Sequence, residues 1–173
     1  MHIVDCSHGR HAAAILDLFN DAILNTTALY DYQPRLPDSM VTWFRDKEAG
    51  RFPVIGAETP SGQLMGFASY GRFRPHAAYK YTVEHSVYVH MDHRRRGVGR
   101  RLMRELIDAA RGQDYHVMVG GVDAKNVASV GLHEKLGFTY AGTIRHAGYK
   151  FGRWLDLAFY QLVLETPAQP TES

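Results

Sequence analysis

Hydrophobic positions recur along the chain with two periods, one of three to four residues and one of two. A short strand is expected at 2–6, and the helix expected after it carries apolar residues at helical spacing: Ile15, Leu18, Phe19, Ala22 and Ile23. A second helix is expected to start near Asp38 or Ser39 and to bury Met40, Trp43 and Phe44. The connection between them, at 25–37, either covers the core or forms a substrate lid.

The middle of the chain alternates strand and helix patterns. Two strand-like runs between 52 and 71 are joined by Thr59-Pro60-Ser61-Gly62, whose composition predicts a hairpin turn. A central strand at 82–89 leads into an amphipathic helix at 97–111 and then a short strand at 116–122. Strand, crossover helix and strand in this order predict two parallel neighbouring strands.

A short helix and two further strands are expected in the C-terminal part. The helix, at 126–136, is expected to pack through its apolar residues, which are Val127, Val130, Leu132 and Leu136. Strands are expected at 138–144 and 154–164, with 145–153 as a glycine-rich basic link. Residues 1–166 are expected to form a single domain, because 173 residues with 45% hydrophobic content suit one core. Residues 167–173 have nothing to bury, which predicts a disordered tail.

The turn between the central strand and the helix at 97–111 is strongly basic. Five arginines surround the start of this helix: Arg94, Arg95, Arg96, Arg100 and Arg101. A helix begins with unpaired N–H groups and a partial positive charge, so each exposed cation there costs ~0.3 to 1 kcal/mol. A phosphate group that accepts the backbone N–H groups near Gly97 and Gly99 would offset this repulsion. The pattern therefore predicts an anion site.

Composition limits the kind of partner and the compartment. The net charge is only +2, so the positive field is local and suits a small polyanion better than a nucleic-acid groove. One cysteine, Cys6, rules out a disulfide framework and a cysteine-based zinc site. No apolar run approaches the ~20 residues of a membrane span, and the N-terminus turns polar at Ser7. We expect a cytoplasmic protein with no membrane contact.

Three histidines lie close together in the sequence, at 85, 90 and 93. On a strand His85 and His90 differ by an odd number of residues, so they point to opposite faces. We therefore expect no metal site.

The central strand carries a carboxylate that packing alone does not explain. Glu84 lies in a strand that also contains Val83, Val87 and Val89, and an acid in a strand is costly to bury without a partner. The preceding loop holds Arg72 and Arg74, which are either solvated surface charges or ligands for a carboxylate. On the helix at 126–136 a polar stripe is formed by Asn126, Ser129 and His133.

Familiar phosphate-binding motifs are missing. The chain has no P-loop string, and the dinucleotide pattern would need a third glycine where Leu102 stands. The turn at 94–99 instead resembles the pyrophosphate motif, (Arg or Gln)-x-x-Gly-x-(Gly or Ala), of the GNAT superfamily of acetyl-CoA-dependent N-acetyltransferases. The segment 126–138 resembles the second signature of that superfamily. The segments 82–89, 132–134 and 148–156 resemble its phosphinothricin and methionine sulfoximine acetyltransferase branch.

This resemblance implies a fold and a co-substrate. The fold would be α/β, the GNAT acyl-CoA N-acyltransferase fold, with a mixed, mostly antiparallel central sheet splayed between strands 4 and 5 and flanked by helices. Acetyl-CoA would be the co-substrate and no metal would be needed. Its contacts would be Val87, Tyr88, Val89, Arg94, Arg95, Arg96, Gly97, Val98, Gly99, Arg100, Asn126, Ser129 and Lys135.

The resemblance also implies the chemistry. Glu84 and His133 match the two catalytic positions of the branch, and the residue chemistry agrees, since a carboxylate can take a proton from an attacking amine and a histidine can give one to a leaving thiolate. Direct transfer is favoured because no nucleophile is evident. Substrate-lining candidates are Arg72, Arg74, Tyr30, Tyr32, Tyr79, Glu84, His85, Ser86 and Lys150. Relatives in the branch are typically homodimers.

Two other functions compete with acetylation of a small amino acid. A peptide or protein N-acetyltransferase would need an open acidic or extended groove, which the cationic, aromatic loop at 72–79 disfavours. A non-catalytic acetyl-CoA-binding module would keep the turn at 94–99 but would need neither Glu84 nor His133.

Overall fold

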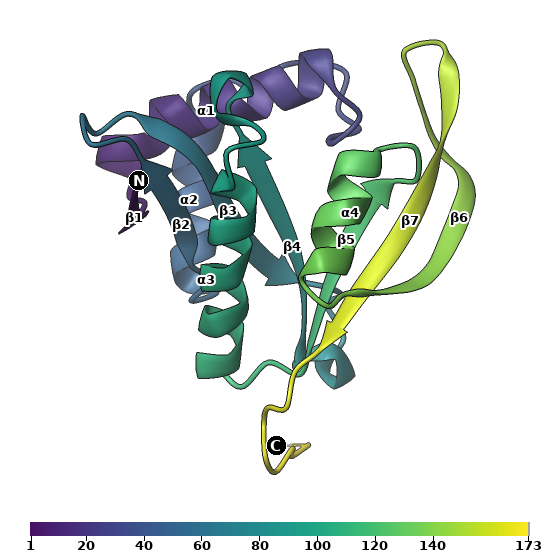
Figure 1. The fold of residues 1–173 in the computed structure, drawn as a ribbon. Coiled ribbons are helices and arrows are strands. Elements are labelled where there is room, and N and C mark those ends of the chain that lie inside the picture. The colour runs from purple at the N-terminus through teal and green to yellow at the C-terminus, as the bar shows by residue number, and fades with distance from the viewer. Residues whose placement is uncertain (173) are drawn as a thin grey trace. The chain divides into compact units, whose positions relative to one another are not determined.

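The computed structural model describes residues 1–172, which form one seven-stranded sheet and four α-helices (Figure 1). In chain order the elements are β1 (His2–Asp5), α1 (His8–Asn25), α2 (Ser39–Ala49), β2 (Val54–Glu58), β3 (Leu64–Arg72), β4 (Thr82–Val89), α3 (Val98–Gly112), β5 (Val117–Asp123), α4 (Val127–Lys135), β6 (Thr139–Lys150) and β7 (Arg153–Val163). Each helix and strand expected from the periodicity is present. Ser173 belongs to the expected tail and lies outside the described residues.

The sheet is mixed and mostly antiparallel, in the strand order β1-β2-β3-β4-β5-β7-β6. Strand β4 pairs with β5 in parallel, which confirms the crossover predicted from the sequence. Their registered pairs are Thr82 with Val117, Val83 with Met118 and Glu84 with Val119. Strand β5 then pairs with β7 along its whole length, from Val117 to Asp123. The parallel ladder therefore ends beside Glu84, while β5 remains held on its other edge.

The described chain divides into two compact units, each made of two segments. Unit 1 comprises 1–69 and 86–103, and unit 2 comprises 70–85 and 104–172. The division cuts through β3, β4 and α3, so the single domain expected from the sequence stays a prediction. In unit 1, helix α1 buries its apolar stripe as predicted, with Phe19 at the centre of an aromatic cluster. Its ring lies 5.2 Å from those of Phe67 and Tyr88.

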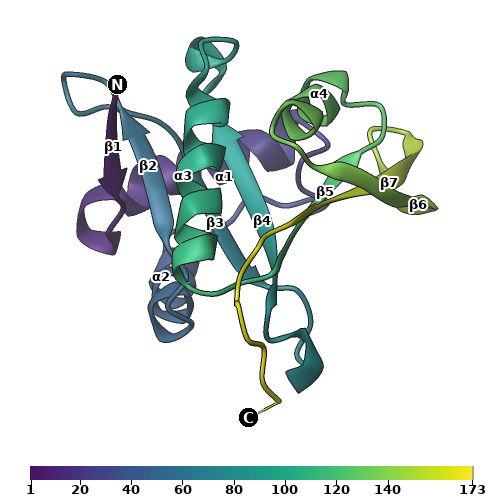
Figure 2. The same ribbon diagram turned by 60° about the horizontal axis from the view of Figure 1, so that its bottom comes forward.

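Strands β6 and β7 of unit 2 form one long hairpin, which corrects the expected link at 145–153 (Figure 2). Two features explain the difference. The turn is only Phe151-Gly152, with positive φ angles of 52° and 72°, as a tight hairpin turn requires. An irregularity between Ile144 and Gly148 interrupts the register, and there the backbone N–H of His146 donates to Asp156. The glycines therefore mark a bulge and a turn inside continuous pairing.

The prediction that α4 packs through its apolar residues is wrong at the N-terminal end of the helix. Val127 was expected to pack, but it is 80% exposed, and the buried residue of this helix is His133, at 2%. With nine residues, α4 presents too little surface for an apolar stripe to fix its orientation.

The end of the described chain also makes contacts in unit 2. The backbone N–H of Thr171 donates to the hydroxyl oxygen of Tyr81 at 3.0 Å. Disorder at 167–173 stays a prediction.

Candidate functional site

In unit 1, the basic turn after β4 has an unusual backbone. Arg95 and Gly97 both adopt positive φ angles, 58° and 80°, and α3 begins at Val98. A non-glycine residue in the left-handed region is uncommon and often marks a functional turn. Alternating left- and right-handed residues before a helix turn successive N–H groups toward a common point, which favours an anion. The side chains of Arg95, Arg96 and Arg100 are exposed around this turn.

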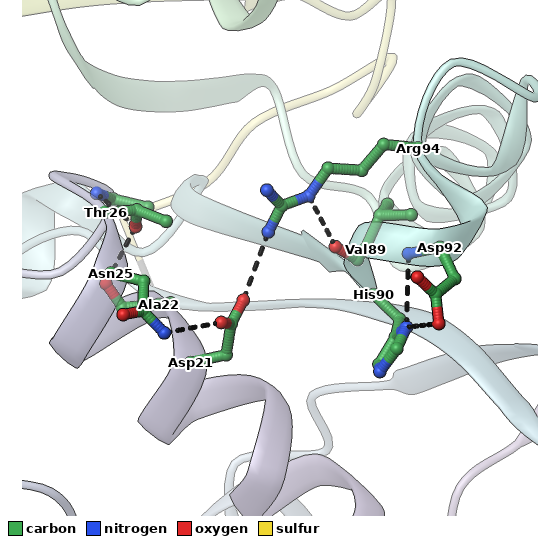
Figure 3. A network of polar contacts seen from close by, with 9 residues as sticks. Asp21, Ala22, Asn25, Thr26, Val89, His90, Asp92 and Arg94 are labelled. Carbon is green, nitrogen blue, oxygen red and sulfur yellow. Dashed lines mark hydrogen bonds and ion pairs between the residues drawn. The ribbon is translucent and has the colours of Figure 1, made fainter.

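The side chain of Arg94, at the start of the turn, is held by two partners (Figure 3). Its Nε donates to the carbonyl oxygen of Val89 at 3.0 Å, and its Nη2 donates to Oδ2 of Asp21 in α1 at 3.2 Å. Asn25, one helical turn further along α1, donates to the other carboxylate oxygen of Asp21 at 2.8 Å. Arg94 therefore ties the last residue of β4 to α1. No sequence motif marked Asp21 for this role.

In unit 2, Glu84 is half-buried at the end of the β4–β5 ladder. Burial raises the pKa of its carboxyl group, and the nearby charge of Arg74 lowers it in part. The guanidinium of Arg74 lies 4.3 Å above the ring of Phe73, and its Nη1 donates to the carbonyl oxygen of Phe73. A methyl group at Gly121 would lie 3.6 Å from Oε1 of Glu84. That distance is an ordinary van der Waals contact, so Glu84 lies directly beside the backbone of β5.

His85 and His133 form a buried pair. Their Nε2 atoms lie 3.0 Å apart, and their rings stack with centroids 5.0 Å apart at 28°. The Nδ1 of His133 lies 2.7 Å from the carbonyl oxygen of Ser129 in the preceding turn of α4. Phe138 packs its ring edge against both imidazoles. The polar stripe expected on α4 therefore points inward at His133, where it contacts β4 instead of solvent.

Burial controls the charge of both rings. Together with a smaller effect of the neighbouring His133, it lowers the pKa of His85 to about 3. Burial also lowers the pKa of His133, although the hydrogen bond with Ser129 opposes this shift. Gly120 makes the contact possible, since a methyl group there would lie 2.5 Å from Nε2 of His85 and 2.6 Å from Nε2 of His133. Both imidazoles are therefore neutral near pH 7.

The remaining sequence candidates occupy varied positions. In unit 2, Asn126 caps α4, because its Oδ1 accepts from the backbone N–H of Ser129 at 3.1 Å. Lys150 is 5% exposed at the end of β6, whereas the side chains of Arg72, Tyr79 and Lys135 are exposed. In unit 1, Tyr88 is buried, Tyr30 is partly buried and Tyr32 is exposed; partial burial also describes Ser86, Val87 and Val89.

Two other kinds of feature are absent from residues 1–172. No group of three His, Cys, Asp or Glu side chains gathers there as a metal site would require. No helix in this range has the length and apolar character needed to cross a membrane.

Comparison with known proteins adds three similarities. Residues 14–138 match the model of the acetyltransferase (GNAT) family. The chain is 44% identical to the L-methionine sulfoximine/L-methionine sulfone acetyltransferase of Pseudomonas aeruginosa, over 92% of this chain and 90% of that protein. It is 38% identical to a phosphinothricin N-acetyltransferase of Streptomyces viridochromogenes, over 91% and 85% respectively.

A solved structure shares both the fold and part of the sequence. It is the GNAT superfamily phosphinothricin acetyltransferase of Sinorhizobium meliloti in complex with acetyl-CoA, with a TM-score of 0.94 and 30% identity. The match covers 99% of this chain and 93% of that one.

The buried pair predicts how stability depends on pH. The folded state holds His85 with a pKa of about 3, whereas an unfolded histidine titrates near ~6.5. As pH falls, the unfolded chain binds the proton first, so the free energy of unfolding should be highest above ~6.5 and should decrease between ~6.5 and about 3. This histidine contributes a slope of up to ~1.4 kcal/mol per pH unit. Urea unfolding at pH 7 and pH 5 measures it.

The matched variant is His85→Gln, which keeps a polar side chain that does not bind a proton in this pH range. Its free energy of unfolding should change less between pH 7 and pH 5 than that of the parent protein. An equal change in both proteins would contradict a neutral, buried His85.

Proposed function

We propose that this protein, which belongs to the acetyltransferase (GNAT) family, transfers the acetyl group of acetyl-CoA to the α-amine of a small amino acid of the methionine sulfoximine, methionine sulfone or phosphinothricin type. The observation that carries the proposal is the half-buried carboxylate of Glu84, in a chain that matches two acetyltransferases of such amino acids over about nine tenths of its length. Homology supports the reaction class and the co-substrate. The residue roles below are our proposal.

The basic turn fits the pyrophosphate of acetyl-CoA. Positive φ angles at Arg95 and Gly97, the start of α3 and the exposed arginines together offer backbone N–H groups and positive charge to an anion. Arg94 keeps the turn attached to β4 and α1. We assign pyrophosphate binding to residues 95–100, and pantetheine binding to backbone groups of Val87 and Val89 and to Asn126, Ser129 and Lys135. The cap at Asn126 uses its Oδ1 and leaves the amide NH₂ to donate.

Glu84 is proposed as the general base. An amine attacks an acyl group only when it is unprotonated, and the bound thioester supplies an acetyl carbon that accepts such an attack. Burial raises the pKa of the Glu84 carboxyl group toward the working pH, which makes its carboxylate a better proton acceptor than a solvated one. Direct transfer in a ternary complex is proposed because the single cysteine, Cys6, has a pKa raised to about 12 by burial and is a poor nucleophile.

Arg74 is the substrate ligand that the structure supports best. Its charge acts on Glu84, so a carboxylate bound to its guanidinium would place an α-amine near the proposed base. Arg72, Tyr79 and Lys150 of the same unit are weaker candidates, and so are Tyr30, Tyr32 and Ser86.

A homodimer is proposed as the assembled form. The β6–β7 hairpin exposes a row of large apolar side chains, each between 49% and 60% exposed: Tyr140, Ile144, Tyr149, Phe151 and Trp154. Aromatic residues of this kind are enriched where proteins associate. A second copy of the chain carries the same row and can bury it by two-fold pairing.

The first prediction concerns the substrate class. Release of CoA from acetyl-CoA should be fast with methionine sulfoximine, methionine sulfone or phosphinothricin, and slower with ordinary amino acids. A peptide with a free N-terminus should not react. Turnover can be followed with a thiol reagent, and absence of turnover with all three analogues would contradict the proposed function. Preference for the peptide would favour the peptide N-acetyltransferase alternative.

The second prediction concerns the base. Glu84→Gln keeps the size of the side chain but cannot accept a proton, so kcat should fall by ~10² to 10⁴. The Kd for acetyl-CoA, measured by calorimetry, should stay nearly unchanged. Glu134→Gln is the matched control, since Glu134 is exposed on α4 in the same unit, and it should leave kcat unchanged. Equal kcat for Glu84→Gln and the parent protein would remove Glu84 from the mechanism.

The third prediction concerns assembly. Trp154→Glu places a charge in the exposed row of the hairpin and should weaken the dimer by about 2 kcal/mol or more, the effect typical of an interface hot spot. Sedimentation velocity over a concentration series measures the shift toward monomer. Val41→Ala, which changes a residue 55% exposed on α2, should not alter assembly. A monomeric parent protein at all concentrations would contradict the proposal.

A further inference from the structure

The contact between His133 and Ser129 determines which nitrogen of His133 carries its proton. A backbone carbonyl oxygen only accepts hydrogen bonds, and it lies 2.7 Å from Nδ1 of His133. Nδ1 must therefore carry the hydrogen. In a neutral imidazole the other nitrogen is then an acceptor, so Nε2 of His133 holds a lone pair.

The same reasoning extends to His85. The two Nε2 atoms lie 3.0 Å apart, and one of them must supply the hydrogen of this bond. Because Nε2 of His133 accepts, Nε2 of His85 donates. Nδ1 of His85 then carries a lone pair and no hydrogen, and this atom is buried without a hydrogen-bond partner among the described residues. One proton on each ring accounts for both contacts.

A further proton on His133 has no favourable place. If Nε2 of His133 were protonated, either two N–H groups would face each other across 3.0 Å, or His85 would have to move its hydrogen to Nδ1, which is buried without a hydrogen-bond partner among the described residues. The rings that pack against His133 are those of His85, Phe138 and Tyr160, and no acidic group among the described residues contributes to the shift of its pKa. A proton donor to a leaving thiolate would have to carry that proton.

The pair also occupies a particular point of the sheet. His85 directly follows Glu84, whose pair with Val119 is the last in the β4–β5 ladder. Opposite it, Gly120 directly follows Val119 and leaves the space in which the two rings meet. Just beyond the end of the backbone ladder, the hydrogen bond between the side chains of His85 and His133 joins β4 to α4.

From these contacts we propose that His133 is a positioning residue: by accepting the hydrogen bond of His85 it fixes β4 at Glu84, and it does not donate a proton to the leaving thiolate. This inference rests on the proposed function for the role of Glu84. It replaces the donor role that the sequence resemblance implies for His133.

The proton balance of the transfer closes without His133. A bond forms between the amine nitrogen and the acetyl carbon, and the carbon–sulfur bond breaks with its electron pair remaining on sulfur. The proton that the amine loses passes to Glu84. The thiolate takes its proton from solvent water, which is adequate because an ordinary thiol has a pKa near ~8.5.

The hydrogen positions can be measured without substrate. In protein labelled with ¹⁵N-histidine, two-bond ¹H–¹⁵N correlation spectra distinguish the two neutral forms of imidazole and the cation. His133 should show the Nδ1–H form and His85 the Nε2–H form, with no change between pH 6 and pH 8. His133 as a cation, or protonated at Nε2, in this range would overturn the proposal.

Two substitutions at 133 separate positioning from proton donation. His133→Gln offers an amide oxygen to His85 but cannot act as a general acid. If His133 only positions β4, kcat should stay within about fivefold of the parent value, whereas loss of a general acid would lower kcat by ~10² to 10⁴. His133→Leu removes the acceptor and should lower kcat strongly, with the KM for acetyl-CoA little changed. Equal, large losses of kcat in both variants would overturn the proposal.

The pH profile and a variant at Gly120 provide independent readouts. The pH dependence of kcat should have the same basic limb in His133→Gln as in the parent protein. Loss of that limb in the variant would show that His133 acts as the acid.

If His133→Gln does not fold, Gly120→Ala still tests the pair, because the added methyl group crowds both rings while both histidines remain in place. It should lower kcat, and an unchanged kcat would overturn the proposal. Absence of turnover in the parent protein would refute the proposed function and leave the spectra to decide the tautomers.

Discussion

The end of the β4–β5 ladder at Glu84 and Val119 is the constraint on which the proposed chemistry depends. Backbone N–H and C=O groups that leave a ladder need other partners, and carboxylates in the interior of a ladder have no room for a substrate. Further along β4, the carbonyl oxygen of Val89 accepts a hydrogen bond from Arg94. Next to Glu84, the side chain of His85 contacts that of His133, so α4 holds β4 where the paired backbone stops.

The fold follows from sequence periodicity because most of its elements are amphipathic. The apolar stripe of α1 and the alternation along β4 depend on local spacing, which a single sequence displays in full. The β6–β7 hairpin was misjudged because a turn of Phe151-Gly152 and a bulge near His146 both resemble loop signals. Only the pairing of distant residues distinguishes a bulge from a link, and a single sequence does not contain that pairing.

The candidate site was predictable where it depends on backbone and motif, and less so where it depends on contacts. The basic turn could be found because arginines at a helix start conflict with the helix dipole. The role of Asp21 could not, since 73 residues separate it from Arg94 and an aspartate on a helix has many ordinary uses. The inward direction of His133 was also hidden, because a histidine in a polar stripe on a short helix looks solvent-facing until its partner in β4 is known.

Unit 2 also shows that the absence of a side chain can matter as much as a functional group. Strand β5 carries consecutive glycines whose neighbours point to opposite faces of the strand: His85 and His133 lie on the side of Gly120, and Glu84 on the side of Gly121. Neither glycine has a side chain that could take part in chemistry, yet a methyl group at Gly120 would lie only 2.5 and 2.6 Å from the Nε2 atoms of the two histidines, whereas one at Gly121 would make an ordinary contact of 3.6 Å with Glu84. In a survey of tolerated substitutions, Gly120 should therefore resemble an active-site residue, although a search based on reactive side chains would pass over it.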